Sequence, residues 1–299
     1  TAALCDIRLK DDLVAAQAGS PLRQALYFND GDGFRPAGGS LEAICAQRPD
    51  EFPACDTARD DIALIAFTSG TTGQPKGTMH MHRDVIAMCD LFPRSVLKPD
   101  ADDIFCGTPP LAFTFGLGGM LCFPMRVGAS TLLIERSTPD SLLAAIARHR
   151  ATILFTAPTF YRQMAARAAQ HDIGSLKKCV SAGEALPDAT RTLWREATGM
   201  EMIDGIGATE MIHIFISSAG ADVRHGAIGK VVVGYEVRIV DDRMNTLPAG
   251  TVGKLAVRGP TGCRYLADER QRVYVRDGWN LPGDTFLMDQ DGYLFYQAR

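Results

Sequence analysis

The stretch TSGTTGQPKG, from Thr68 to Gly77, follows directly after the apolar run IALIAF at 62–67. The apolar run predicts a buried strand. The ten residues after it combine three glycines, four hydroxyl side chains and one lysine. A strand that leads into such a loop presents backbone N–H groups and hydroxyls to an anion, and Lys76 adds a positive charge. The stretch therefore predicts a phosphate-binding loop.

A loop of this composition has close alternatives. A Walker A loop, GxxxxGK[ST], fails because Pro75 precedes the lysine and Gly77 follows it. A nicotinamide fingerprint fails as well, since no GxGxxG opens a helix after an early strand. On composition alone, a glycine-rich surface turn without a ligand stays open.

Strands and helices alternate in the pattern that follows this loop. One helix is predicted at 138–150, with Thr138 as its cap and Pro139 in its first turn, and another at 187–199, ending at Gly199. Further strands are predicted at 130–134, 151–155 and 177–182. Such alternation is typical of crossover units on a largely parallel sheet.

The pattern changes after about Gly226, where strand-like pieces are separated by Gly, Pro and Asp turns. We therefore expect an α/β fold with two parts. Residues 1–226 form a large core of mostly parallel sheets and helices, whose first sixty residues are the least regular. Residues 227–299 form a smaller β-rich subdomain.

The composition excludes several classes of protein. At 46% hydrophobic and 22% charged residues, the chain is an ordinary globular protein. The net charge of -4 argues against nucleic acid as a partner. No apolar run reaches the ~18 residues of a membrane span, and no signal peptide opens the sequence. The eight cysteines contain no CxxC pair, which indicates reduced thiols in a cytoplasmic protein and not a zinc site or disulfide frame.

TSGTTGQPKG closely resembles the phosphate loop of the adenylate-forming superfamily, which includes acyl-CoA synthetases, peptide-synthetase adenylation domains and luciferases. Five later motifs resemble the successive core motifs of that superfamily in the same order: SAGEAL (181–186), GIGATE (205–210), VGKLAVRGP (252–260), WNLPGDTF (279–286) and DGYLFYQAR (291–299). The resemblance covers the chain from about Asp60 to its end.

The resemblance implies a reaction in which a carboxylate attacks the α-phosphate of ATP, and a thiol, usually coenzyme A, then displaces AMP. It implies catalytic roles for Thr209, at the α-phosphate, and Glu210, as the ligand of Mg²⁺. It implies that Asp284 and Arg299 bind the ribose, although Pro282 departs from the usual threonine. The other nucleotide-binding residues that it implies are Thr68, Ser69, Gly70, Thr71, Thr72, Gly73, Lys76, Gly183, Glu184, Asp204, Gly205 and Ile206.

Two stretches are expected to line the acyl pocket. One contributes Phe113, Thr114 and Phe115, and the other contributes Gly207, His213 and Ile214. Ile206 stands where many relatives have an aromatic residue, and with the following EMIHIF it is similar to the benzoate and 2-aminobenzoate CoA ligase branch. His213 is then expected at the substrate carboxylate, as neutral or charged imidazole, with a hydrogen-bonded core histidine as the alternative. His80 and His82 are expected to pack and not to bind metal.

The leading interpretation is therefore an aryl-CoA ligase core that uses ATP, Mg²⁺ and coenzyme A. Alternatives are a short- or medium-chain acyl-CoA synthetase and a nucleotide-binding module with little turnover. In the superfamily, a C-terminal lid with the adenylation lysine follows a hinge near the position of Arg299. We expect that lid and part of the first subdomain to be absent, so that the chain binds nucleotide with weak or no turnover. A homodimer is left open.

Overall fold

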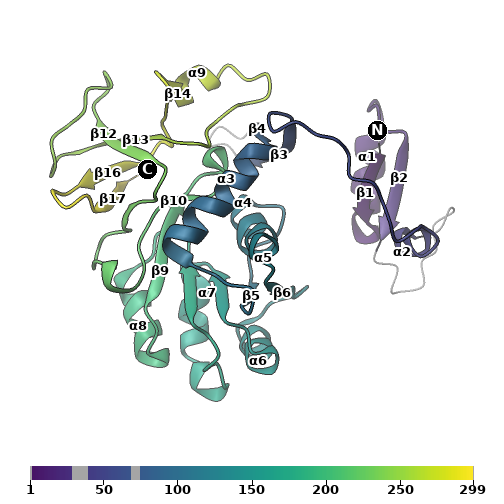
Figure 1. Ribbon diagram of the computed structural model, residues 1–299, viewed down its shortest axis with the longest axis horizontal. Coiled ribbons are helices and arrows are strands. Elements are labelled where there is room, and N and C mark those ends of the chain that lie inside the picture. Colours follow the sequence, from purple (N-terminus) through teal and green to yellow (C-terminus); the bar gives the residue numbers. More distant parts are fainter. Residues whose placement is uncertain (1, 29–39, 69–74, 299) are drawn as a thin grey trace. The chain divides into compact units, whose positions relative to one another are not determined.

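The computed structural model describes residues 2–28, 40–68 and 75–298 (Figure 1). The chain divides into two compact units, residues 1–57 and residues 58–299. The predicted boundary after residue 226 lies inside the second unit and stays a prediction.

The first unit is built around a short parallel strand pair. Strand β1 (Ala2–Asp6) pairs in parallel with β2 (Gln24–Phe28), and α1 (Lys10–Gln17) connects them. Helix α2 (Leu41–Cys45) follows, with the Ser40 hydroxyl accepting from the backbone N–H of Ala43. None of these four elements was predicted from the sequence. None of the four contains a fully buried side chain, so the sequence lacks the apolar periodicity that would have revealed them.

The second unit contains a seven-stranded sheet, in the order β11-β10-β9-β8-β7-β5-β6. The pairs from β6 to β9 are parallel, and β10 and β11 are added antiparallel. The strands are β5 (Ile104–Gly107), β6 (Ser130–Leu132), β7 (Ile153–Thr156), β8 (Lys178–Ser181), β9 (Met202–Gly207), β10 (Ile214–Ser217) and β11 (Lys230–Val231). The predicted parallel sheet is confirmed.

Helices cover both faces of this sheet (Figure 1). On one face α6 (Pro139–His149), α7 (Pro158–Ala165) and α8 (Asp188–Thr198) bury Leu142, Tyr161 and Trp194 against alternate strand residues such as Leu154. On the other face, α3 (His82–Phe92) and α5 (Phe123–Val127) bury Phe92 and Phe123 against Phe155. The strands β5, β7 and β8 are therefore buried on both faces, which explains the apolar runs in and around them.

The local signals of two predicted helices are confirmed. The Thr138 hydroxyl accepts from the backbone N–H of Ser141 at the start of α6, and Pro139 is its first residue. Helix α8 follows Pro187 and ends before Gly199, whose φ of +74° lies in the left-handed region that favours glycine.

The apolar run before the predicted phosphate loop does not join the parallel sheet. Strand β3 (Ile62–Thr68) pairs antiparallel with β4 (Lys76–Met81) in a two-stranded sheet of its own. Ile62, Ile65 and Phe67 are 50%, 39% and 65% exposed, and only Ala66 is buried in this strand. The prediction of a strand is confirmed, but the prediction that it is buried is wrong.

A six-stranded sheet follows in the chain, in the order β14-β15-β13-β16-β17, with β12 paired to β13. Its strands are β12 (Glu236–Val240), β13 (Val252–Arg258), β14 (Val275–Arg276), β15 (Trp279–Asn280), β16 (Thr285–Met288) and β17 (Leu294–Ala298), with α9 (Gln271–Tyr274) before β14. Leu255, Val257 and Phe286 belong to the same hydrophobic cluster as Phe92 and Phe155, so the two sheets share one core.

Within the described ranges, no helix has the length and apolar character needed to cross a bilayer. All eight cysteines are free, and Cys89, Cys106, Cys179 and Cys263 are buried.

Candidate active site

A cavity of about 650 Å³ lies at the carboxyl ends of the parallel strands. Its walls come from the segments that follow β5, β7, β8 and β9, together with the start of β10. The lining residues are Thr108, Pro109, Pro110, Phe113, Thr114, Phe115, Ala157, Ala182, Gly183, Glu184, Gly207, Ala208, Thr209, His213 and Ile214. The crevice outside the carboxyl ends of the strands is where open α/β sheets bind ligands.

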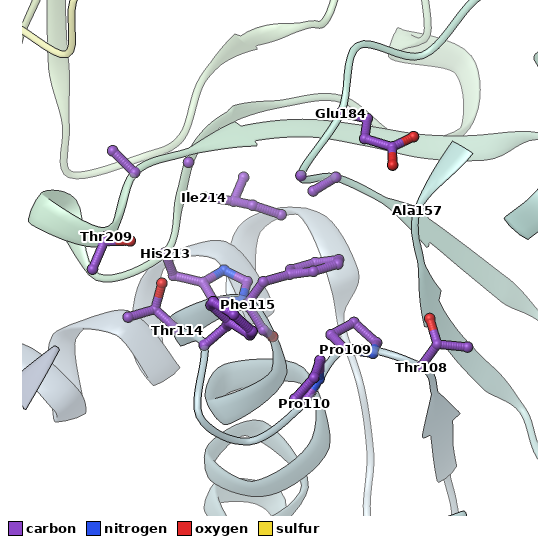
Figure 2. Close-up of a pocket in the computed structure, with 15 residues that line it drawn as sticks. Thr108, Pro109, Pro110, Thr114, Phe115, Ala157, Glu184, Thr209, His213 and Ile214 are labelled. Atoms are coloured by element: carbon purple, nitrogen blue, oxygen red, sulfur yellow. The ribbon is translucent and has the colours of Figure 1, made fainter. Parts of the chain in front are cut away.

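The walls of this cavity are mostly apolar. Figure 2 shows Phe115 beside His213, with Ile214 near them and Glu184 on another part of the wall. Of the described lining residues, none is a lysine or arginine. An apolar cavity of this size with a few hydroxyl groups, such as those of Thr108 and Thr114, can take a small aromatic ligand.

His213 is a buried neutral side chain in this wall. Its Nε2 donates to the carbonyl oxygen of Phe115 at 3.4 Å, while Nδ1 has no hydrogen-bond partner among the described residues. The imidazole packs against Phe92, Phe115 and Phe123, with ring centroids 4.6 to 5.8 Å apart. Burial lowers the pKa of His213 to about 3. Of the two expected states, only the neutral imidazole is therefore populated at neutral pH.

Gly207 is required by the backbone at the floor of the cavity. It pairs with Ile214 across β9 and β10, and a Cβ at this position would lie 2.7 Å from the carbonyl oxygen of His213. A larger residue would push the two strands apart.

A second cavity, of about 160 Å³, adjoins the first. It is lined by Asp204, Gly205, Ile206, Asp284 and Tyr296, among others, and it shares Gly183, Glu184 and Gly207 with the larger cavity. Gly183 has a φ of +86°, which allows the chain to turn sharply after β8. The two cavities therefore meet along the segments that follow β8 and β9.

Asp204 and Asp284 are the buried carboxylates of the smaller cavity. Burial raises the pKa of Asp204 to about 7, although Arg191, 4.0 Å away, and the N–H of Gly205 both favour the charged form. Asp284 lies directly before β16. Carboxylate oxygens in a cavity of this size can accept hydrogen bonds from a pair of ligand hydroxyls.

Glu210 belongs to a compact group of charged and polar side chains. It lies in the 3-10 turn η5 (Thr209–Met211) and is 8% exposed. Its Oε1 accepts a short hydrogen bond from the hydroxyl of Tyr265 and lies 3.7 Å from Nζ of Lys76. Lys76 also donates to the same hydroxyl at 2.8 Å. Burial and the bond to Glu210 raise the pKa of Tyr265, so its hydroxyl keeps its proton.

His80 supports the backbone of this turn. It is fully buried, and its Nε2 donates to the carbonyl oxygen of Thr209 at 2.8 Å. Burial lowers the pKa of His80 below its usual value, so the ring is neutral at pH 7. The expectation of packing is confirmed for His80 and is wrong for His82, which is exposed at the start of α3. The hydrogen bond from His80 to Thr209 is an additional finding.

The structure brings together most of the predicted site residues. The acyl-pocket residues line the larger cavity, and Glu184 accepts from the Thr159 hydroxyl at 2.7 Å on its rim. Thr68 ends β3 opposite Lys76, which begins β4. Ser69, Gly70, Thr71, Thr72, Gly73 and Arg299 lie outside the described residues.

Sequence reasoning missed Tyr265, Tyr296 and the role of His80. Tyr296 could have been found from the sequence, because it lies in the strand DGYLFYQAR, two residues after buried Leu294 and on the same face of the strand. Tyr265 and His80 offered no local signal, since their partners lie 55 and 129 residues away in the sequence.

Comparisons with known proteins identify a family and several relatives for this chain. The profile of a family described as "AMP-binding enzyme" matches residues 7–265. A benzoate–CoA ligase of Thauera aromatica is 37% identical over 266 residues, which is 87% of this chain and 50% of the relative. A 3-hydroxybenzoate–CoA ligase of Aromatoleum sp. (strain CIB) is 33% identical over 269 residues, 88% of this chain and 51% of the relative.

The fold also matches solved structures. A crystal structure of an anthranilate CoA ligase in complex with anthranoyl-AMP superimposes with a TM-score of 0.93 at 36% identity, covering 100% of this chain and 58% of that chain. The chain spans about half the length of the curated relatives it matches.

Proposed function

The chain belongs to the AMP-binding enzyme family, and from this membership we propose that it is the core of an ATP-dependent aryl-CoA ligase. In the proposed reaction a benzoate or 2-aminobenzoate carboxylate attacks the α-phosphate of ATP to give an acyl-adenylate and pyrophosphate. The thiol of coenzyme A then attacks the acyl carbon and releases AMP.

The observation that carries this proposal is the junction of the two cavities. One is apolar and walled by Phe115 and Ile214, the other contains the carboxylates of Asp204 and Asp284, and both share Gly207. An acyl-adenylate has the same division, with an aromatic ring at one end and a hydroxyl-rich nucleoside at the other. We assign the ring to the larger cavity and the nucleoside to the smaller one, with Tyr296 as an aromatic wall for adenine.

The names of the relatives support an aromatic acid. The relatives are a benzoate–CoA ligase, a 3-hydroxybenzoate–CoA ligase and an anthranilate CoA ligase. The acid in each name has a flat ring with one carboxylate. Neutral His213 and Phe115 provide an aromatic wall for such a ring, and buried Phe92 and Phe123 pack against His213 from behind.

The phosphates of ATP are assigned to the region between Lys76, Thr209 and Glu210. The residues fit Mg²⁺, since Glu210 offers one carboxylate next to Thr209 and 3.7 Å from Lys76. Mg²⁺ commonly takes one or two protein carboxylates and completes its shell with phosphates and water. When bound, the ion would neutralise charge on the phosphates. Glu210 would hold it, and Lys76 would hold a phosphate oxygen.

The test is a calorimetric titration of the 299-residue chain with non-hydrolysable adenylate analogues that carry benzoyl, 2-aminobenzoyl or hexanoyl groups. We expect both aryl analogues to bind at least tenfold more tightly than hexanoyl, a difference of about 1.4 kcal/mol. Equal or tighter binding of hexanoyl would favour a short- or medium-chain acyl-CoA synthetase. No binding of any analogue would contradict the proposal for this chain.

A cytoplasmic location and a homodimer remain parts of the proposal. The eight free cysteines support a reducing compartment. Sedimentation of the chain over a hundredfold range of concentration would test the dimer, which would show as a mass of twice 32.3 kDa.

A further inference from the structure

Tyr265 lies between the two charged side chains that the proposed function assigns to the phosphates and the cation. Its hydroxyl accepts from Nζ of Lys76 at 2.8 Å and donates to Oε1 of Glu210. Lys76 Nζ also lies 4.7 Å from the centroid of the tyrosine ring. One buried side chain, 5% exposed, therefore contacts both charges at once.

The backbone around Tyr265 is fixed to the hairpin that carries Lys76. Met79 donates to the carbonyl oxygen of Arg264 at 2.7 Å, and Leu266 donates to that of Gly77 at 2.8 Å. These two bonds pair residues 264–266 with β4 and set Tyr265 opposite Thr78. The N–H of Tyr265 also donates to the side chain of Gln271. The ring is thus held by its backbone independently of its hydroxyl.

The hydroxyl of Tyr265 contacts only one of the two carboxylate oxygens of Glu210, which leaves the other for a ligand. Both the bond from Tyr265 and the close approach of Lys76 involve Oε1, and no described residue donates to Oε2. The side chains of Lys76 and Glu210 are only 18% and 11% exposed, so water screens their attraction weakly. Without the hydroxyl between them, the two charges would close into a direct pair.

We propose that Tyr265 is a positioning residue for MgATP. It fixes Oε1 of Glu210, turns Oε2 toward the cation, and keeps Lys76 from closing onto the carboxylate, so that each charge stays available for its own ligand. This inference rests on the proposed function, because it takes the ligand to be a nucleoside triphosphate with its divalent cation.

The test compares Tyr265→Phe with Tyr274→Phe. The Tyr274 ring packs edge-on against that of Tyr265 at 5.7 Å, and its buried hydroxyl has no hydrogen-bond partner among the described residues. The two variants therefore remove the same atom from neighbouring rings, and only one removes the bridge. Affinities for AMP and for a non-hydrolysable ATP analogue with Mg²⁺ are measured by calorimetry, together with the Mg²⁺ concentration that gives half-maximal binding of the analogue.

We expect Tyr265→Phe to weaken binding of the Mg²⁺–ATP analogue about tenfold, equivalent to about 1.4 kcal/mol, and to raise the Mg²⁺ midpoint several-fold. AMP lacks the outer phosphates, so its affinity should change less than twofold. Tyr274→Phe should match the wild type in all three measurements. This pattern separates positioning of the charges from general damage to the fold.

Two results would overturn the inference. Wild-type affinity of Tyr265→Phe for the Mg²⁺–ATP analogue would show that the bridge is dispensable, and an equal loss for AMP would show a structural role only. In both cases wild-type binding of nucleotide leaves the proposed function standing. If the wild-type chain binds neither nucleotide, the proposed function fails together with the inference.

Discussion

Nε2 of His80, in β4, donates a 2.8 Å hydrogen bond to the backbone carbonyl oxygen of Thr209, in the turn that carries Glu210. The bond ties the hairpin beside the predicted phosphate loop to the end of the seven-stranded sheet. His80 is fully buried, so the bond is protected from water and its loss would leave the Thr209 carbonyl without this partner.

The first prediction concerns this bond. His80→Ala should lower the free energy of unfolding by about 2 kcal/mol, because it removes a buried hydrogen bond and leaves a cavity. His80→Gln, whose side-chain amide can still donate, should recover part of the loss. Urea denaturation would measure both, with His225→Ala as the control at an exposed histidine. Equal stability of His80→Ala and the wild type would contradict the prediction.

The second prediction concerns His213 and pH. Burial lowers the pKa of His213 to about 3, whereas an unfolded histidine has a pKa of about 6.5. The unfolded state therefore binds more protons between these values, and the stabilising contribution, fully present above pH 6.5, is lost as pH falls. Relative to His213→Asn, the wild type should lose about 2 kcal/mol of stability between pH 7.5 and pH 5. Parallel pH profiles of the two proteins would rule this out.

The third prediction concerns Asp204, for which stability falls and does not rise with increasing pH. Burial raises the pKa of Asp204 to about 7, above the unfolded value of about 3.9. The folded state then binds more protons between these values, so stability is lost as pH rises through pH 7. Asp204→Asn removes the titration and keeps an oxygen for the N–H of Gly205. Denaturation at pH 5 and pH 8 should show the variant gaining about 2 kcal/mol on the wild type over that interval. A constant difference would mean that Arg191 keeps Asp204 charged.

Local signals and motifs were sufficient for part of the structure. Pro187 and Gly199 delimit α8 through backbone preferences that operate within a few residues, and the structure confirms both. The motifs also identified residues that the structure brings close together. Gly207 and Asp284 line the two connected cavities, and Glu210 lies in the turn η5 beside them, as the resemblance implies.

Long-range contacts could not be predicted in the same way. Whether Phe67 is buried depends on what covers β3, and a run of apolar residues does not contain that information. Tyr265 and Lys76 are 189 residues apart in the sequence and meet only because residues 264–266 pair with β4. The pKa of His213 likewise follows from three phenylalanines on separate segments, which no spacing in the sequence reveals.

The last prediction concerns the junction of the cavities. In Gly207→Ala the new Cβ would lie 2.7 Å from the carbonyl oxygen of His213 and 2.8 Å from its carbon, both backbone atoms. Strands β9 and β10 must then separate, which should cost about 1–3 kcal/mol of stability.

Because Gly207 lines both cavities, the same change should weaken binding of the benzoyl-adenylate analogue at least tenfold. Gly174→Ala is the matched control, since its Cβ would meet only Asp172, at 3.4 Å. Thermal unfolding and calorimetry on the two variants would check both effects. If Gly207→Ala keeps wild-type stability and affinity, the strands tolerate a side chain there, and Gly207 does not determine what the cavities bind.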